Sequence, residues 1–180
     1  MHIARVHKRA TLAVAAVAAL ALAAFLVLGA DWTASAGRGP QPNNQFVATL
    51  TGLQEVPAIS TPARGRFVAT VDGDRIHFRL TYNRLQGAEA LFAHIHFGQR
   101  AVNGGVIVHL CGGPRPACPH PFGTVEGTIR RGDIEGPASQ GIAPGEFDEV
   151  VRAMRSRVTY VNVHTDLFPS GEIRGQLIPR

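Results

Sequence analysis

Three histidines stand at positions from which their side chains could hold a metal ion. His94 and His96 are separated by one residue in an apolar, strand-like run, and His164 lies in a second run of the same kind. Alternate side chains of a strand share a face, so His94 and His96 are expected to project together. Imidazole nitrogens are common ligands of copper and zinc. The pattern predicts a metal site, with copper as the first candidate, zinc as the second, and His109 as a candidate fourth ligand.

The same histidines have a structural interpretation. A hydrogen-bonded polar cluster would hold each imidazole through a backbone carbonyl, or through the side chain of Asn162 or Thr165. A His-x-His pair with a distant histidine also resembles part of the copper site of Cu/Zn superoxide dismutase. A catalyst of that kind should hold a second metal through a bridging histidine and an aspartate, and the sequence contains no second cluster of this type. We therefore assign no catalytic residue and favour a non-catalytic role.

Glu55, Glu172 and Arg174 form a second constellation. Glu172 and Arg174 alternate along one strand face, and Glu55 precedes a proline in a predicted turn. One carboxylate could act as a general base. However, the sequence lacks a nucleophile elbow, a phosphate-binding loop and a dinucleotide fingerprint. The favoured interpretation is a set of structural ion pairs that supports the last strand.

The N-terminus has the pattern of an export signal. A basic head precedes an apolar stretch over residues 10–30, and Ala34-Ser35-Ala36 fits a signal-peptidase site. We predict a signal peptide over residues 1–36 and a linker over 37–45. The alternative is an uncleaved anchor, because about 20 apolar residues span a bilayer. Both alternatives predict an exported domain that is periplasmic, on the cell surface or secreted, and contact with a membrane is expected only if the segment is retained.

Cysteine use and charge add two further expectations. Cys111 and Cys118 are the only cysteines, and a close pair in an exported chain is expected to form a disulfide. A site built from cysteine and histidine is the alternative, which an oxidising compartment disfavours. The formal net charge is +5 at pH 7, and the basic residues form no run that is interleaved with aromatics. Nucleic acid is therefore not an expected partner.

Most of the chain after the linker follows a period of two, which is typical of strands. The strands are predicted at 46–51, 67–71, 76–82, 90–97, 105–111, 122–130, 157–164 and 172–178. One segment over residues 146–155 has helical spacing instead, with acidic residues early and arginines late, as the helix dipole favours. This pattern predicts an all-β fold, an antiparallel Greek-key sandwich or barrel, with one short helix inserted before the penultimate strand.

Several blocks of sequence resemble a known family. The blocks are Phe46–Pro57, Ala93–Gly98, Asn103–Gly104, Tyr160–Thr165 and Gly171–Leu177. Together and in this order they are similar to the chordin-type (CHRD) domain. The resemblance runs from about Phe46 to Leu177, and it implies a CHRD-like β domain over residues 46–180. It implies a small extracellular β domain, which occurs alone in bacteria. The family has no settled biochemical activity.

Two classes of function follow from the residues and the resemblance together. The first is an extracytoplasmic binding module without catalytic activity, whose ligand is a protein, a glycan or a component of the cell envelope. The second is a copper-binding or zinc-binding protein of the periplasm or cell surface that uses His94, His96 and His164. A site of neutral imidazoles predicts that metal affinity falls below about pH 6.5.

Overall fold

The structure, a computed structural model, describes residues 43–180. The predicted signal peptide over residues 1–36 and residues 37–42 of the predicted linker lie outside this range. No helix in the described part of the chain is both long enough and apolar enough to cross a membrane.

The described residues form nine strands and one α-helix, joined by turns that include three short 3-10 helices. Alternation of apolar and polar residues produces the strands, as the burial of every second residue in β2 and β3 illustrates. The strands are β1 (Gln45–Thr51), β2 (Arg64–Asp72), β3 (Arg75–Asn83), β4 (Ala90–Phe97), β5 (Gly105–Cys111), β6 (Gly123–Arg130), β7 (Thr159–Thr165), β8 (Ile173–Gln176) and β9 (Ile178–Pro179). The helices are η1 (Gly52–Gln54), η2 (Arg131–Asp133), η3 (Ala138–Gln140) and α1 (Phe147–Arg155).

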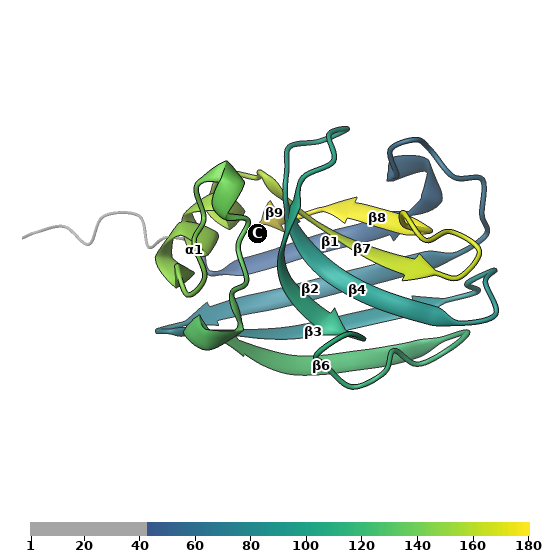
Figure 1. Cartoon of the computed structure of the whole chain (residues 1–180), viewed down its shortest axis with the longest axis horizontal. Coiled ribbons are helices and arrows are strands. Elements are labelled where there is room, and N and C mark those ends of the chain that lie inside the picture. The colour runs from purple at the N-terminus through teal and green to yellow at the C-terminus, as the bar shows by residue number, and fades with distance from the viewer. Residues whose placement is uncertain (1–42) are drawn as a thin grey trace, which may run out of the picture. The chain divides into compact units, whose positions relative to one another are not determined.

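The strands form one antiparallel sheet in the order β5-β4-β7-β8-β1-β2-β3-β6, and β9 pairs with β1. The sheet curves into a nearly closed barrel (Figure 1). Its two edge strands, β5 and β6, do not pair as a ladder. The connection after β6 approaches β5 instead, where the Glu135 amide donates a 2.9 Å hydrogen bond to the Ile107 carbonyl. The predicted all-β antiparallel fold is therefore confirmed, and the barrel describes it better than the sandwich.

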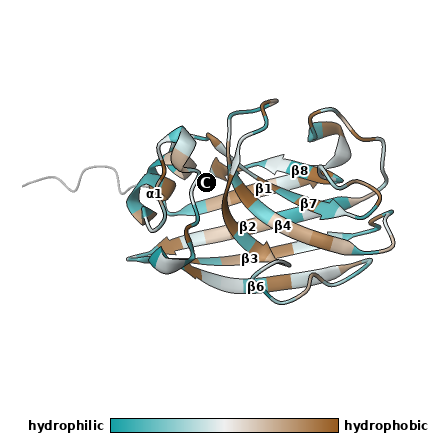
Figure 2. Ribbon diagram, in the orientation of Figure 1, coloured by the Kyte–Doolittle hydropathy of each residue, from teal (hydrophilic) through white to brown (hydrophobic). Residues whose placement is uncertain are grey.

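The single helix precedes β7, as the sequence predicted. Phe147, Val150 and Met154 are buried on one side of α1, while Asp148 and Arg152 follow the charge order that the helix dipole favours. The last predicted strand is divided into β8 and β9, which pair at different positions along β1. Figure 2 shows α1 with a hydrophobic side and a hydrophilic side at one end of the barrel.

The core fills the inside of the barrel. Phe46, Leu50 and Phe67 of β1 and β2 are fully buried there with Ile95 of β4 and Val161 of β7. Close packing of this kind fixes the strands relative to one another. It therefore also fixes the side chains that these strands present on their outer faces.

The predicted disulfide between Cys111 and Cys118 is confirmed. It joins the end of β5 to the loop that leads to β6, across a Cα–Cα distance of 5.1 Å. A disulfide fits a location outside the cytoplasm.

Candidate metal centre

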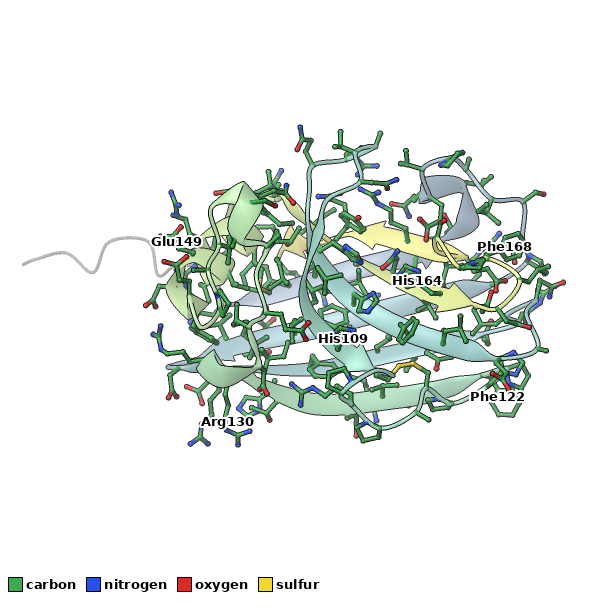
Figure 3. The ribbon with its side chains drawn as sticks, viewed as in Figure 1. His109, Phe122, Arg130, Glu149, His164 and Phe168 are labelled. Carbon is green, nitrogen blue, oxygen red and sulfur yellow. A yellow bond between two sulfur atoms is a disulfide. The ribbon has the colours of Figure 1, made fainter. Side chains whose placement is uncertain are left out.

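Two neighbouring strands bring the three predicted histidines together. β4 lies between β5 and β7, and in its register with β7 Phe92 pairs with His164 while His94 pairs with Asn162. Directly paired residues in an antiparallel sheet project on the same face. The three imidazoles therefore gather on the outer face of the barrel wall, opposite the apolar core. Figure 3 labels His164 of this group.

This outer face is covered rather than solvated. His94 and His96 are each 7% exposed and His164 is 8% exposed. One nitrogen of each ring lies within 4.8 Å of a nitrogen of both other rings. The closest approach is 3.1 Å, between Nδ1 of His94 and Nε2 of His164. The sequence prediction that these three residues converge is thus met by the geometry.

Backbone carbonyls fix the protonation pattern of two of the rings. Nδ1 of His96 donates to the carbonyl of Gly104 at 2.9 Å, and Nδ1 of His164 donates to the carbonyl of Pro169 at 2.9 Å. A carbonyl oxygen only accepts, so in the neutral rings Nε2 carries the lone pair. Both lone pairs then point into the cluster. This arrangement is common among histidines that bind metals, because the second ring nitrogen orients the first.

The hydrogen bond between His94 and His164 follows from the same logic. Nδ1 of His164 already donates to Pro169, so its Nε2 accepts from Nδ1 of His94 at 3.1 Å. Oδ1 of Asn162 lies 3.0 Å from the same Nε2 and is also an acceptor, so this proton arrangement requires the carboxamide to turn over and present its NH2 group there. Within residues 43–180, Nε2 of His94 and Nε2 of His96 are buried without a hydrogen-bond partner. A buried polar atom without a partner costs free energy, and such atoms are rare in folded proteins.

Burial also keeps the imidazoles uncharged. It lowers the pKa of His94 from 6.5 to about 3 and that of His96 from 6.5 to about 4, and the neighbouring histidines lower the pKa of His94 further. The pKa of His164 is lowered for the same primary reason, its burial. All three rings are therefore neutral near pH 7, which is the state that binds metal ions.

His109 lies beside the cluster without joining it. It pairs with His94 across β5 and β4, and the two rings make an edge contact with their centroids 4.3 Å apart. Its Nδ1 lies 2.7 Å from a carboxylate oxygen of Glu135. The group of mutually close ligand atoms in the described chain contains His94, His96 and His164 but not His109. The candidate fourth ligand is therefore an edge neighbour of the site in this geometry.

The sequence analysis missed a stack of side chains that supports His96. The ring of Tyr160 lies parallel to His96, with an interplanar angle of 3° and centroids 4.8 Å apart. The guanidinium carbon of Arg174 lies 3.4 Å from the centroid of the Tyr160 ring. The hydroxyl of Tyr160 accepts a 3.2 Å hydrogen bond from the Gly104 amide. The alternation of Tyr160, Asn162 and His164 along β7 could have placed all three on this face.

The predicted ion pairs among Glu55, Glu172 and Arg174 were wrong in their partners. Within the described residues, no carboxylate lies within 4.0 Å of the Arg174 guanidinium. Arg174 donates to two backbone carbonyls and one side chain of the β4–β5 loop: Gln99, Val102 and Asn103. Glu172 accepts from neutral donors: the hydroxyls of Thr61 and Thr165 and the amide of Gln86. Two separate hydrogen-bonded networks therefore replace one charge network.

Glu55 is buried beside the β4–β5 loop. Within the described chain, no cation lies within 4.0 Å of its carboxylate. It is 7% exposed, and its Oε1 has no hydrogen-bond partner in the described chain. Burial raises its pKa from 4.5 to about 7, although the positive charge of Arg174 and the Val56 amide act in the opposite direction. Gly171 must be a glycine here, because a Cβ would lie 2.4 Å from Oε1 of Glu55.

This carboxyl group predicts a pH-dependent stability. Its folded pKa exceeds its unfolded value, so Glu55 stabilises the fold below about pH 4.5 and this contribution is lost as the pH rises to about 7. The lowered pKa values of His94 and His96 act oppositely, increasing stability between about pH 3 and 6.5. Comparison with Glu55→Gln cancels the histidine contribution. We expect the stability of wild type relative to this variant to fall by roughly 2–3 kcal/mol between pH 4.5 and 7.

Urea unfolding of both proteins at several pH values measures this difference. Asp166→Asn is the matched control, because Asp166 is exposed and its pKa is lowered by backbone hydrogen bonds rather than raised. A difference between wild type and Glu55→Gln that stays constant from pH 4.5 to 7 would contradict the assignment.

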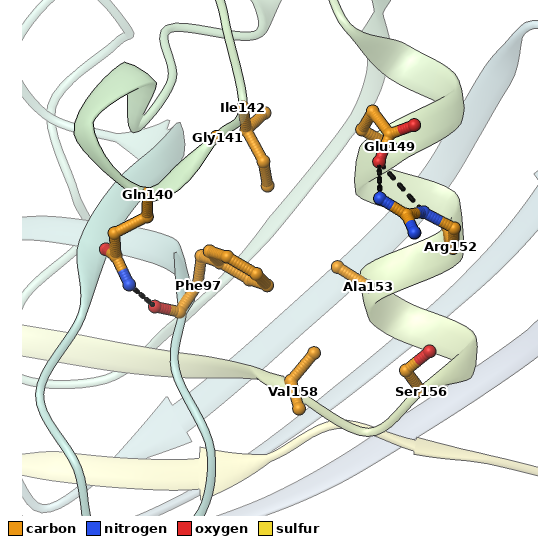
Figure 4. A pocket seen from close by; sticks show the side chains of 9 residues that line it. All are labelled: Phe97, Gln140, Gly141, Ile142, Glu149, Arg152, Ala153, Ser156 and Val158. Carbon is orange, nitrogen blue, oxygen red and sulfur yellow. Dashed lines mark hydrogen bonds and ion pairs between the residues drawn. The ribbon is translucent and has the colours of Figure 1, made fainter.

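A pocket of 170 Å³ lies apart from this site, between α1 and the segment 140–142 (Figure 4). Phe97 and Val158 line it with residues of the helix, and Gln140 donates a hydrogen bond to the Phe97 carbonyl. None of the clustered histidines lines this pocket.

The comparisons with known proteins identify one family, and its match lies over the same residues as the barrel. The model of the CHRD domain family matches residues 46–177. No curated protein and no solved structure gives a match. The match covers most of the chain and nearly all of the described barrel, including both histidine-bearing strands. The chain therefore belongs to the CHRD domain family.

Proposed function

We propose that this CHRD domain binds one transition-metal ion, with copper preferred to zinc, through His94, His96 and His164. The observation that carries the proposal is the pair of buried Nε2 atoms on His94 and His96 that have no partner in the described chain. In a purely structural cluster these atoms are a net cost, since each loses its hydrogen bond to water on burial. A bound metal ion would satisfy Nε2 of His96, and it would satisfy Nε2 of His94 if that ring binds through Nε2 rather than through the Nδ1 that faces His164.

The ligand set favours copper. All three donors are neutral imidazoles, and no carboxylate or thiolate belongs to the group of close ligand atoms. Sites of this type bind Cu(II) more tightly than the other divalent first-row ions, including zinc. The disulfide and the apolar N-terminal segment support export, and in this proposal the domain holds copper in the periplasm, on the cell surface or in the medium.

The distances fit an ion after a small adjustment. Nitrogen ligands lie about 2.0–2.1 Å from zinc, which places two ligand nitrogens of a tetrahedral site roughly 3.4 Å apart. The His94–His164 approach of 3.1 Å is already close to that value. The ligand atoms of the group lie up to 4.8 Å apart, so they must approach one another by up to roughly 1.4 Å to hold one ion. His94 must also transfer its Nδ1 proton to Nε2 if Nδ1 becomes the ligand, and the transfer leaves its charge unchanged.

Metal content measures the proposal directly. The purified domain is exposed at about pH 7 to Cu(II), Cu(I) or Zn(II) separately, desalted, and analysed for metal per chain. We expect about one retained copper ion and weaker retention of zinc. Electron paramagnetic resonance of the Cu(II) form should show coupling to nitrogen ligands. Equal metal retention by the triple variant His94→Ala/His96→Ala/His164→Ala, or retention of no metal by the wild type, would overturn the proposal.

A further inference from the structure

A second surface of the barrel has the features of a binding site, on the wall away from the histidines. The outer face of β2, β3 and β6 is exposed and polar, because the alternate residues of these strands point into the core. At one end of this face Arg66 pairs with Thr81 and Arg64 pairs with Asn83 across β2 and β3. These four side chains border a hollow of 250 Å³.

The hollow is rich in unneutralised positive charge. Within residues 43–180, neither Arg64 nor Arg66 has a carboxylate within 4.0 Å, and Arg84, which directly follows β3, also has none. Glu126 on the same face is paired with Arg79. Asp72 lies at the far end of β2, eight residues from Arg64 and thus about 26 Å away. Arginines gathered without an acid repel one another, and an anion between them would remove that cost.

The neutral neighbours indicate what kind of anion fits. Thr81 and Asn83 contribute a hydroxyl and a carboxamide, which match a ligand rich in hydroxyl groups. Phe122 is 69% exposed and precedes Gly123, which pairs with Tyr82 at the edge of the hollow. An exposed aromatic ring provides a flat apolar surface on which the C–H face of a sugar ring can pack. One such ring does not form the series of stacking platforms that single-stranded nucleic acid requires.

We infer that this hollow binds an acidic group, a sulfate ester or carboxylate, of a linear anionic polysaccharide. Arg64 and Arg66 form charge-assisted hydrogen bonds with the acidic group. Phe122 packs against the neighbouring sugar ring, and the exposed threonines of the face contact its hydroxyls. The site is separate from the histidine cluster and does not depend on a bound metal.

Binding of dextran sulfate, with uncharged dextran as the comparison polymer, tests the inference on the full domain. We expect the wild type to bind dextran sulfate and not dextran. Arg64→Gln/Arg66→Gln should weaken binding by about tenfold or more, since the charge-assisted hydrogen bonds to the acidic group are lost. Phe122→Ala should weaken it about threefold without any change in charge. The matched control, Arg152→Gln/Arg155→Gln on α1, loses the same charge and should bind as the wild type does.

Any one of the following results would overturn the inference. Equal weakening by the α1 control would mean attraction by net charge alone. Unchanged binding by Phe122→Ala would mean that the sugar ring is not recognised. Vesicles of phosphatidylglycerol serve as the membrane arm, and binding to them that matches dextran sulfate and is lost in Arg64→Gln/Arg66→Gln would assign the hollow to anionic lipid. Failure of the wild type to bind dextran sulfate would exclude the site.

Discussion

Copper should raise the melting temperature of the wild-type domain by about 10 °C or more and leave that of His96→Ala unchanged. A ligand present at 1,000 times its Kd stabilises the folded state by about 4 kcal/mol, and in a domain of this size each kcal/mol moves Tm by roughly 3–5 °C. His96 is the most informative of the three ligands to remove, because within the described chain it makes no hydrogen bond to another histidine, whereas His94 and His164 bond to each other. Differential scanning calorimetry without copper and with free copper at about 1,000 times its Kd gives both shifts.

Thermal unfolding without metal distinguishes a metal site from a histidine cluster that is only structural. Without metal, His96→Ala should lose only about 1–3 kcal/mol, the cost of leaving the Gly104 carbonyl without its donor. The matched control is His77→Ala, since His77 is exposed on β3 and bonds only to the Thr128 hydroxyl. It should keep the full copper shift. A wild type that melts at the same temperature with and without copper would end the metal proposal.

The dependence of this shift on pH is a further signature of burial. Free imidazoles would begin to lose copper to protons below about pH 6.5. Burial lowers the pKa of His94 to about 3 and that of His96 to about 4, so protons compete for these nitrogens only in stronger acid. The affinity should therefore change little between about pH 7 and 5. The sequence alone predicts this loss below about pH 6.5, the value for an exposed imidazole, because burial is not visible in a residue's type.

The fold was largely predictable because its strands obey a simple period. The alternation in β2 and β3 and the Asp72-Gly73-Asp74 turn between them define a hairpin, and the structure forms it with every residue from Arg64 to Asp72 in register. The pattern could not predict that the sheet curves into a nearly closed barrel. The choice between sandwich and barrel depends on how β5 and β6 approach each other, and the loop contact from Glu135 to Ile107 that joins them has no local signal.

The histidines of the candidate site could be predicted from the sequence, but the groups that orient their rings could not. Alternation places His94 and His96 on one face, and the matching context of His164 suggested a neighbouring strand. The carbonyls of Gly104 and Pro169 that orient the rings belong to loops, and any residue type supplies a carbonyl. The ion-pair prediction failed for a related reason: backbone acceptors and neutral hydroxyls can satisfy a buried charge as well as an opposite charge does, and a sequence does not reveal them.

Arg174 gives the largest expected effect on stability. Replacing it by methionine should lower the free energy of unfolding by roughly 3–5 kcal/mol, because three hydrogen bonds from a charged donor are lost and each contributes about 1.5–3 kcal/mol at most. Arg174 is 1% exposed, and its guanidinium satisfies the carbonyls of Gln99 and Val102 and the side chain of Asn103. Methionine fills a similar volume but donates no hydrogen bond, so the loop residues Gln99, Val102 and Asn103 would all lose the donor that holds them.

Arg174→Met should also weaken copper binding, although Arg174 is not a ligand. A substitution that only loosened the packing would leave copper binding unchanged. Arg174 covers one face of the Tyr160 ring, whose other face supports His96, so its removal frees the ring that orients a ligand. Arg174→Lys keeps the charge without the planar fork and should lose an intermediate amount of stability. Arg100→Met is the matched control, because Arg100 lies exposed in the same loop and should change stability by less than about 0.5 kcal/mol. Urea unfolding of the four proteins tests the ranking. If Arg174→Met lies within about 1 kcal/mol of wild type, the loop is held by other contacts. If Arg174→Met retains copper as the wild type does, the stack of Arg174, Tyr160 and His96 has no role in positioning the site.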